Sequence, residues 1–368
     1  MTRTSKVLGV SLAVLVVAGA ALAYLVSHDS PCGAAPAPAS GTAAMQAIVY
    51  RCYGPPTVLH LESIAKPAPK DNEVLVRVHA ASVNPLDWHY MRGTPYLVRL
   101  EAGLGAPTDP RMGVDFAGTV EAVGRSVTRF KPGDEVFGGR HGAFAEYVSV
   151  REDRAVVLKP ANVSFEQAAS TPIAALTALQ ALRDKGALRA GQKVLINGAS
   201  GGVGTFAVQI AKALGAEVTG VCSTRNVEMV RSLGADRVLD YTKEDYTRGD
   251  QQYDLILDTV GNHSLLDNRR ALAPRGIFVI AGGPTHGNWI GPMAVPLRAL
   301  LLSPWVSQSF RPFLAQLNRD DLTVVSELMQ AGKLTPAIDR RYPLSEVPAA
   351  IAYLEEGHAR GKVIISVE

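Results

Sequence analysis

The chain has 368 residues, a formal net charge of +3 and three cysteines. This length is enough for two domains of ordinary size, each with its own hydrophobic core. The near-neutral charge and the lack of a basic run argue against a nucleic-acid partner. The scattered Cys32, Cys52 and Cys222 are too few for a disulfide framework or a Cys-x-x-Cys metal site.

The first 44 residues form an apolar segment and a tether. Arg3 and Lys6 precede the apolar residues 7–26, and the Pro- and Ala-rich residues 30–44 follow. An apolar segment of this length matches the thickness of a bilayer core, whereas the apolar part of a secretory signal is usually shorter. We therefore expect a single-pass N-terminal membrane anchor over about residues 7–26. The alternative is a signal peptide cleaved at Ala21-Leu-Ala23.

Residues 45 to about 159 are divided into short apolar runs by Gly and Pro. The runs include 74–78 and 118–123, and Lys131-Pro-Gly-Asp134 is a turn motif between two of them. Alternation with a period of two residues is typical of half-buried strands, and a Pro-Gly pair is a strong turn signal. We expect a β-rich, barrel-like domain over residues 45–164.

The pattern changes at about residue 165, where helical and strand-like segments begin to alternate. The predicted helices are 165–182, 203–214 and 226–233, and the predicted strands are 193–197, 216–222, a short one near 238, 254–258 and 276–281. Strands that alternate with helices indicate a parallel, doubly wound α/β sheet. We expect this domain to cover residues 165–310.

The remainder of the chain first loses and then regains a regular pattern. Residues 282–322 are apolar, irregular and interrupted by prolines, and we expect a lid or an interface there. A predicted helix over 345–356 and a predicted strand over 362–367 end the chain. We expect residues 311–368 to return to the first domain, which leaves the α/β domain inserted within it.

A glycine-rich turn lies between the first strand and the following helix of the α/β domain. Asn197-Gly-Ala-Ser-Gly-Gly-Val-Gly204 follows the apolar run 193–196 and opens the helix 203–214. Glycines let backbone amides approach a pyrophosphate, and the helix N-terminus adds partial positive charge. The motif predicts a dinucleotide site, and the expected contacts are Gly198, Ser200, Gly201, Gly202, Val203 and Gly204.

Several short motifs, taken in order, carry a family resemblance. They are Ser82-Val-Asn-Pro-Leu-Asp87, Gly113-Val-Asp-Phe-Ala-Gly118, Phe130-Lys-Pro-Gly-Asp134, Gly142-Ala-Phe-Ala-Glu-Tyr147, Thr171-Pro-Ile-Ala-Ala-Leu-Thr-Ala178, the glycine-rich turn, Asp258-Thr-Val-Gly261 and Gly361-Lys-Val363. From residue 45 onward the chain resembles the medium-chain dehydrogenase/reductase superfamily, and more narrowly its zinc-independent quinone oxidoreductase branch. The resemblance implies a GroES-like catalytic domain, a Rossmann domain, and a cofactor in the cleft between them.

The end of the second predicted strand of the α/β domain indicates the type of cofactor. NAD enzymes carry an acidic residue there for the ribose 2′-hydroxyl, whereas this chain has Ser223, Thr224 and Arg225. Hydroxyls and a guanidinium suit a 2′-phosphate, so we expect NADPH rather than NADH. The alternative roles are a helix N-cap for Ser223 and a solvated side chain for Arg225.

Five further residues complete the expected cofactor site. Tyr241 matches a position that contacts the 2′-phosphate in related reductases. Asp258 and Val260 belong to a turn near the nicotinamide ribose, where a purely structural role is the alternative for Asp258. Gly282 and Gly283 would let backbone lie beside the nicotinamide.

The positions of the zinc ligands in zinc-dependent relatives carry other residues in this chain. Asn84 stands where those relatives have a Cys, Val114 stands where they have a His, and the four-Cys structural lobe has no counterpart. Catalytic zinc needs three protein ligands. Asp87 and Asp115 without a Cys or His beside them are a poor set for zinc, so we expect none.

Asn84, Tyr96 and His89 are the candidate catalytic residues. Asn84 offers amide donors where the metal would lie, for orienting the substrate or the nicotinamide ribose. The resemblance makes Tyr96 the candidate proton donor, although it stands one residue later than in enoyl-thioester reductases. His89 occupies the place of a Tyr in several quinone reductases, and its role as an acid, a stacking residue or an exposed residue is open.

The residues favour reduction of a conjugated substrate. Without a Lewis acid an unactivated ketone is difficult to reduce, whereas a quinone or enone needs only hydrogen-bond donors at its oxygen. We predict an NADPH-dependent, zinc-independent reductase of quinones or α,β-unsaturated carbonyls that forms a homodimer. The alternatives are an alcohol dehydrogenase or enoyl-thioester reductase of the same fold and, in another class, a membrane-tethered nucleotide-binding module for interaction or redox sensing.

The predicted anchor and the predicted cofactor conflict over the side of the membrane. Arg3 and Lys6 favour a cytoplasmic N-terminus, which places the globular domain outside. Binding of a nicotinamide cofactor favours the cytoplasm. The orientation is therefore left open.

Overall fold

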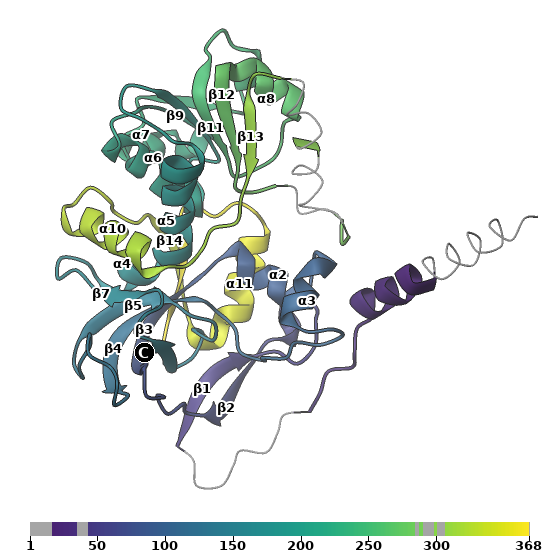
Figure 1. Cartoon of the computed structure of the whole chain (residues 1–368), viewed down its shortest axis with the longest axis vertical. Helices are drawn as coiled ribbons and strands as arrows, with labels where there is room; N and C mark the ends of the chain where they lie inside the picture. The colour runs from purple at the N-terminus through teal and green to yellow at the C-terminus, as the bar shows by residue number, and fades with distance from the viewer. Residues whose placement is uncertain (1–16, 35–42, 284–286, 290–297, 300–305, 368) are drawn as a thin grey trace, which may run out of the picture.

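Two large sheets of different construction form the body of the protein (Figure 1). The computed structural model describes residues 17–34, 43–283, 287–289, 298–299 and 306–367. Within these residues the chain forms a seven-stranded mixed sheet, a six-stranded parallel sheet and a two-stranded hairpin. The parallel sheet lies at the top of Figure 1, and the mixed sheet and the hairpin lie below it.

The mixed sheet has the order β14-β15-β3-β4-β5-β7, with β6 paired to β3. Its strands are β3 (Glu73–Val83), β4 (Asp115–Val123), β5 (Glu135–Gly139), β6 (Tyr147–Arg151), β7 (Val156–Leu158), β14 (Ile338–Pro343) and β15 (Lys362–Ser366), and the hairpin is β1 (Ala44–Val49) with β2 (His60–Ala65). Alternate valines of β3, Val74, Val76 and Val78, pack in a buried cluster with Phe116 and Val136. This arrangement confirms the predicted β-rich fold, because the period of two places one set of side chains on the core face.

Helices follow β3 in a short run. They are α2 (Pro85–Arg92), the 3₁₀ turn η2 (Tyr96–Val98) and α3 (Arg99–Ala102), and another 3₁₀ turn, η1 (Pro56–Val58), precedes β2. Helix α2 begins at Asn84, whose backbone N–H donates to Asp87 Oδ2 at 2.7 Å in a capping box. It ends at Gly93, whose φ of +59° is the left-handed conformation that glycine adopts readily.

The helix predicted over residues 165–182 is interrupted. It divides into α4 (Phe165–Ala169), α5 (Pro172–Leu179) and a π-helical turn, η3 (Gln180–Lys185). Pro172 causes the first break, because proline has no N–H for a helix interior and disfavours a helical residue before it. The prediction of one helix was wrong here, because it followed the apolar pattern across this proline.

The parallel sheet has the order β10-β9-β8-β11-β12-β13. Its strands are β8 (Lys193–Asn197), β9 (Glu217–Cys222), β10 (Arg237–Asp240), β11 (Tyr253–Asp258), β12 (Leu272–Ile280) and β13 (Ser309–Pro312). The chain starts in the middle of the sheet, moves outward to β10, and then returns to the other side of β8. This order is that of a dinucleotide-binding sheet, and its switch point lies between β8 and β11.

Helices cover the parallel sheet, as the alternating pattern predicted. They are α6 (Gly202–Ala213), α7 (Val227–Ser232) and α8 (Leu265–Ala271), with the 3₁₀ turns η4 (Thr224–Asn226) and η5 (Tyr246–Arg248). Phe206 and Ile210 of α6 belong to the same buried cluster as Val194 and Ile196 of β8. Burial of such side chains supplies most of the free energy that holds a helix on a sheet.

The last part of the chain returns to the mixed sheet. Helix α10 (Arg319–Gln330), the 3₁₀ turn η8 (Leu344–Glu346) and α11 (Val347–Glu355) precede β15, which pairs antiparallel with β3. Much of the predicted lid, 282–322, lies outside the described residues, although β13 and the start of α10 fall within it. The boundaries 45–164, 165–310 and 311–368 stay a proposal.

The predicted single-pass anchor over residues 7–26 is wrong. Among the residues that the structure describes, which include only 17–26 of that segment, no helix combines the length and the apolar character needed to cross a membrane. The helix that is described there ends at residue 27, whereas a span needs about 20 apolar residues. The sequence pattern had joined this helix to residues 7–16, which lie outside the described residues.

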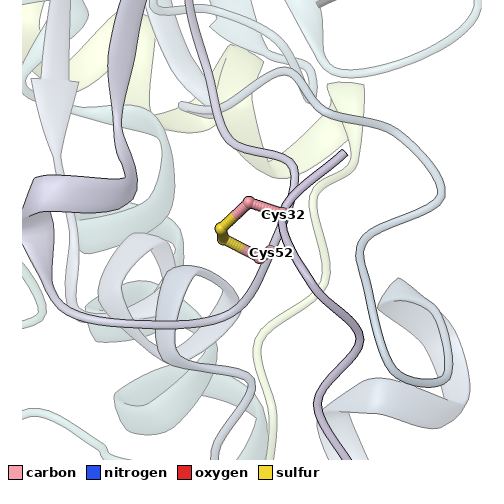
Figure 2. The surroundings of a disulfide bond; sticks show 2 residues. All are labelled: Cys32 and Cys52. Atoms are coloured by element: carbon pink, nitrogen blue, oxygen red, sulfur yellow. A yellow bond between two sulfur atoms is a disulfide. The ribbon is translucent and has the colours of Figure 1, made fainter. Parts of the chain in front are cut away.

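A disulfide joins the N-terminal segment to the connection between β1 and β2 (Figure 2). Cys32 and Cys52 are bonded, with their Cα atoms 4.6 Å apart. The sequence analysis had excluded a disulfide framework and did not predict this single bond. A pairing of two cysteines 20 residues apart has no local signature, because it depends on where the N-terminal segment packs.

Candidate active site

The glycine-rich turn lies at the switch point of the parallel sheet. Gly198 follows β8 with a φ of +87°, and a Cβ atom there would lie 2.3 Å from Thr259 Oγ1. A Cβ atom on Gly204 would lie 2.0 Å from Gly198 O. Both positions therefore require glycine for packing: the first for a sharp turn and the second for close contact of α6 with that turn.

Gly201 and Gly202 lie where α6 begins and are not enclosed in this way. A Cβ atom on Gly201 would meet only Gly198 O, at 3.4 Å, and no side chain caps this 12-residue helix. The first amides of α6 are thus available to an anion, next to half-buried Ser200 and Val203. This geometry fits the pyrophosphate of a dinucleotide.

Asn197 and Asp258 close the switch point from the carboxyl ends of β8 and β11. Asn197 Nδ2 donates to Asp258 Oδ1 at 2.9 Å, and the backbone amides of Val260 and Gly261 donate to the same oxygen at 2.9 Å each. Burial raises the pKa of Asp258, and these donors oppose that rise. Asp258 therefore shapes the turn, which leaves Val260 exposed as the residue that can touch a ligand.

The residues expected at the 2′-phosphate lie at the end of β9. Arg225 is exposed, and its Nη2 donates to the backbone oxygen of His358 at 3.0 Å. The hydroxyl of Thr224 donates to Asp240 Oδ2 at 2.5 Å, and the side chain of Tyr241 is exposed. Half-buried Ser223 precedes them.

Asp240 is a carboxylate that sequence reasoning missed. It ends β10, beside the end of β9, and donors from Thr224 and Thr242 hold its pKa well below the usual range. The neighbouring Tyr241 was predicted to contact the cofactor, but the sequence alone does not show the parallel register that brings Asp240 opposite Cys222. Its oxygens are engaged by hydroxyls and lie 3.1 Å from Lys243 Nζ.

Asn226 is a second residue that the sequence analysis missed. Its Nδ2 donates to Ser200 Oγ at 3.1 Å and to Ser223 Oγ at 3.2 Å, so it links the glycine-rich turn to the end of β9. Its Oδ1 is buried and has no hydrogen-bond partner among the described residues. A buried acceptor without a partner costs free energy, which a hydroxyl donor of a bound ligand would recover.

The segment after β12 also approaches the switch point. A Cβ atom on Gly282 would lie 2.3 Å from Thr259 O, whereas one on Gly283 would meet nothing within 4 Å. Gly282 is thus required for close packing against the turn after β11. Gly283 offers open backbone, as a nicotinamide contact would need.

A buried charged network lies where zinc-dependent relatives hold their metal. Lys362 Nζ donates to Asn84 Oδ1 at 2.5 Å and to Val83 O at 3.2 Å, and lies 3.7 Å from Asp115 Oδ2. Asn84 Nδ2 donates to Asp115 Oδ2 at 2.9 Å. Both polar atoms of the Asn84 amide are therefore engaged, so the expected donation to substrate requires a rearrangement.

Burial raises the pKa values of the two carboxyl groups in this network and lowers that of the lysine. It raises the pKa of Asp87 to about 7, against the hydrogen bond from the Asn84 amide and with help from the nearby Asp115 charge. It raises the pKa of Asp115 as well, opposed by Lys362, and it lowers the pKa of Lys362, opposed by Asp115. One ammonium thus faces two carboxyl groups in a site closed to water.

The second expected ligand position holds Val114, which is buried and apolar. Among the described residues no group of three or more His, Cys, Asp or Glu side chains is placed to hold a metal ion. At the Asn84 position the Lys362 ammonium lies against Asn84 and Asp115.

His89 and Tyr96 lie on the chain after Asn84, at the side of the catalytic domain that faces residues 287–289. His89 Nδ1 lies 2.7 Å from Thr94 O, and because a carbonyl only accepts, Nδ1 carries the hydrogen. Burial lowers the pKa of His89. The Tyr96 amide donates to Asn288 O at 2.7 Å, and the ring contacts Trp289 edge to face at 4.9 Å.

Family models match two parts of the chain. An alcohol dehydrogenase GroES-like domain matches residues 70–161, and a model described as zinc-binding dehydrogenase matches residues 233–365. The first range contains strands β3 to β7 of the mixed sheet with Asn84, and the second contains β10 to β13 of the parallel sheet and most of the C-terminal return, whereas the glycine-rich turn lies between the two ranges.

Named relatives cover most of the chain. The mitochondrial NAD(P)H oxidoreductase RTN4IP1 of Mus musculus is 36% identical over 80% of this chain and 82% of its own length. A chloroplastic NADPH-dependent alkenal/one oxidoreductase of Arabidopsis thaliana is 35% identical over 87% of this chain and 79% of its own length. The structure of the quinone oxidoreductase from Coxiella burnetii superposes with a TM-score of 0.78 at 32% identity, and covers 89% of this chain and all of that one.

Two glycines of the turn provide a test that separates folding from binding. We expect Gly204→Ala to lower the free energy of unfolding by about 1–3 kcal/mol or more, because its methyl group would overlap Gly198 O. Gly201→Ala should stay within about 1 kcal/mol of the native chain, because its methyl group would meet only Gly198 O, at 3.4 Å. It should weaken dinucleotide binding, because the methyl group would lie where we expect the pyrophosphate to approach the backbone. Chemical denaturation and NADPH fluorescence titration measure the two effects. Equal destabilisation by both substitutions would contradict this packing.

The buried Asp87 predicts a pH-dependent stability. Its pKa is raised from 3.8 to about 7, so the folded chain holds this proton more tightly than the unfolded chain does. The resulting contribution to the free energy of unfolding is fully present below pH 3.8 and is lost as the pH rises through 7. Asp87→Asn keeps the acceptor for the Asn84 amide and removes the titration. The variant should gain stability relative to the native chain between pH 4 and 7, by at most about 1.4 kcal/mol per pH unit. Denaturant unfolding at several pH values, with exposed Asp250→Asn as control, tests this; a constant difference across the range would refute it.

Proposed function

The chain belongs to the medium-chain dehydrogenase/reductase superfamily, among its quinone oxidoreductase-like members, and on this premise we propose that it transfers hydride from NADPH to a quinone or an α,β-unsaturated carbonyl without zinc. Membership makes the chain an oxidoreductase that uses a nicotinamide cofactor. The choice of NADPH, the lack of zinc and the residue roles are our inferences from the site.

The observation that carries the proposal is the position of the Lys362 side chain. Its ammonium lies against Asn84 and Asp115, and its Cδ lies 3.4 Å from where a Cβ on Gly202 would be. Lys362 therefore connects the dinucleotide corner to the position of the metal in zinc-dependent relatives. A second cation at that position would be repelled by the ammonium.

A site without a Lewis acid is suited to conjugated substrates. When bound, NADPH supplies the hydride. In a quinone or an enone the hydride goes to the far carbon, and the charge collects on an oxygen that hydrogen-bond donors can stabilise. Simple ketones lack this route and need stronger polarisation. The substrate class therefore follows from the chemistry of the donors.

The residues around the glycine-rich turn fit a dinucleotide phosphate. Gly201 and Gly202 leave the amides of α6 open for the pyrophosphate. The unpaired Oδ1 of Asn226 is placed to accept a hydrogen bond from a ribose hydroxyl. Exposed Arg225, with its planar donors, is our candidate for the 2′-phosphate, because the nearby Asp240 is already engaged by Thr224.

Tyr96 is our candidate for proton donation to the substrate oxygen. It is half-buried, and its hydroxyl oxygen lies 3.5 Å from Asn288 Nδ2 in the wall of a cavity that Arg99 also lines. His89 is a weaker candidate, because burial lowers its pKa and its Nδ1–H is committed to Thr94 O. We assign His89 to positioning the segment that carries Tyr96.

We also propose a homodimer. Strand β13 ends the parallel sheet, and its only described sheet partner is β12. The outer edge of such a strand presents backbone groups to which a second copy can pair.

Arg225 provides the test of cofactor choice. We expect NADPH-dependent turnover of 9,10-phenanthrenequinone, and we expect Arg225→Gln to raise the KM for NADPH by about 10- to 100-fold, because it removes a charge-assisted contact. The KM for NADH should change little. Arg231→Gln, which removes the same charge from an exposed pair on α7, is the matched control. Equal effects of Arg225→Gln on both cofactors would rule out the 2′-phosphate contact, and no turnover with any quinone or enone would rule out the proposed reaction.

Metal content provides the test of the zinc-free site. Protein purified after growth with added zinc should contain no stoichiometric zinc, because Lys362 opposes a cation at Asn84 and Asp115. Turnover should be unchanged by 1,10-phenanthroline. Elemental analysis and steady-state rates measure both quantities. One zinc per chain, lost together with activity on chelation, would contradict the proposal.

A further inference from the structure

The N-terminal strap, which we define as residues 26–32, lies against the catalytic domain. The amide of Ser30 donates to Gly105 O at 2.9 Å, and the side chain of Val26 is buried. In the described part of the chain before residue 35, Val26 is the one buried hydrophobic residue. The strap therefore has little apolar area of its own to hold it in place.

Polar contacts to Arg99 attach the strap. The guanidinium of Arg99 donates to Val26 O at 3.1 Å and to His28 O at 3.4 Å, and its Nη2 lies 2.8 Å from Asp29 Oδ1. Outside the strap it donates to Gly93 O at 2.8 Å. Arg99 is only 2% exposed, yet most of its hydrogen-bond and ion-pair partners belong to the strap. A buried guanidinium that loses such partners is strongly disfavoured.

Arg99 also contacts Tyr96, the candidate proton donor. Its guanidinium carbon lies 4.7 Å from the ring centre of Tyr96 and 4.5 Å from that of Tyr53. Asp29 of the strap lines the same cavity as Tyr96, Arg99 and Asn288. The strap is therefore part of the wall that holds Tyr96 in position.

The Cys32–Cys52 disulfide is the covalent attachment of the strap (Figure 2). Cys52 is 5% exposed, whereas Cys32 lies on an exposed stretch of chain. A cavity lined by both cysteines, Arg51 and His60 adjoins the bond. Without the bond the strap would be linked to the domain only through the connection to β1, so its local concentration at Arg99 would fall.

We propose that this disulfide is a thiol-exchange site, a latch that holds the strap against the wall of the cavity lined by Tyr96 and Arg99, where the substrate would bind. A thiolate of a dithiol reductant attacks the sulfur of Cys32, the S–S bond breaks, and Cys52 leaves as a thiolate that takes up a proton. The second thiol of the reductant then attacks the mixed disulfide and releases Cys32 as a thiol. The dithiol is oxidised to a disulfide, and its two electrons reduce the cysteine pair.

Release of the strap should weaken substrate binding. Arg99 loses its contacts to Val26, His28 and Asp29, so the segment that carries Tyr96 is held less firmly. The KM for the substrate should rise, because a misplaced wall weakens binding and positioning. The latch itself stands apart from the proposed function, and only this kinetic consequence rests on it.

The experiment compares the oxidised full chain, the chain reduced with dithiothreitol, and the variant C32S/C52S. Intact mass after thiol alkylation reports the bond. Hydrogen exchange of peptides that contain Ser30 and Gly105 reports the strap. Steady-state turnover of 9,10-phenanthrenequinone reports KM and kcat separately. The double variant measured with and without dithiothreitol is the matched control, because it keeps Cys222 and every other site at which the reductant could act.

We expect faster exchange at both peptides and a KM raised by about 3- to 10-fold in the reduced chain and in the variant. The variant should not respond further to dithiothreitol. Two free thiols at Cys32 and Cys52 in the oxidised chain, or a strap equally protected in all three samples, would overturn the latch. Faster exchange with an unchanged KM would overturn its link to the substrate. If no quinone or enone is reduced, the proposed function fails, and hydrogen exchange still decides the latch.

Discussion

The contact of the Lys362 ammonium with Asn84 and Asp115 is the interaction on which the arrangement of the site depends. Lys362 begins β15, Asn84 caps α2 after β3, and Asp115 begins β4. Asp115 also accepts a hydrogen bond from the amide of Ile173 in α5, at 3.0 Å. One buried charge cluster therefore connects the start of α2, the mixed sheet and α5, the helix that leads to the parallel sheet. Removing the Lys362 ammonium would leave the buried Asp115 with hydrogen-bond donors but without its closest opposite charge, which is the costly case.

This cluster depends on the return of the chain to its first domain after the parallel sheet. Asn84 follows β3 and Asp115 begins the neighbouring strand β4, whereas the ammonium comes from a third segment, β15. Strand β15 supplies it by pairing with β3, and its position next to Gly202 places the same side chain beside the dinucleotide corner. A single residue, Lys362, thus contacts both the dinucleotide corner and the buried charge cluster at Asn84.

The sequence was informative where a local pattern decides the structure. The predicted positions of the strand over 193–197, the glycine turn and the following helix agree closely with the structure. Gly198 is required by its positive φ and its contact with Thr259, and Gly204 by its contact with the Gly198 backbone. Contacts between segments that are distant in the sequence could not be predicted from a local pattern. Lys362 belonged to a recognised motif, yet its partner Asn84 lies far away in the sequence. Asp240 and Asn226 were missed for a similar reason, because the register of β9 and β10 and the packing of η4 determine what they face. The membrane anchor was wrongly inferred from hydropathy alone, because no helix among the described residues is both long and apolar enough to cross a membrane.

The two buried cations of the catalytic domain differ in where their partners come from. The oxygen atoms around Lys362 belong to the ends of β3 and to β4, so that centre is complete once the sheet has formed. Arg99 is equally hidden from solvent, but it depends on oxygen atoms of the strap, which a disulfide and a few polar contacts keep in place. The first cation is therefore held by the sheet itself, whereas the second depends on the strap, in which Val26 is the one buried hydrophobic residue among the described residues. This contrast makes the wall around Tyr96, rather than the charged centre at Asn84, the part of the site that a change at the N-terminus can reach.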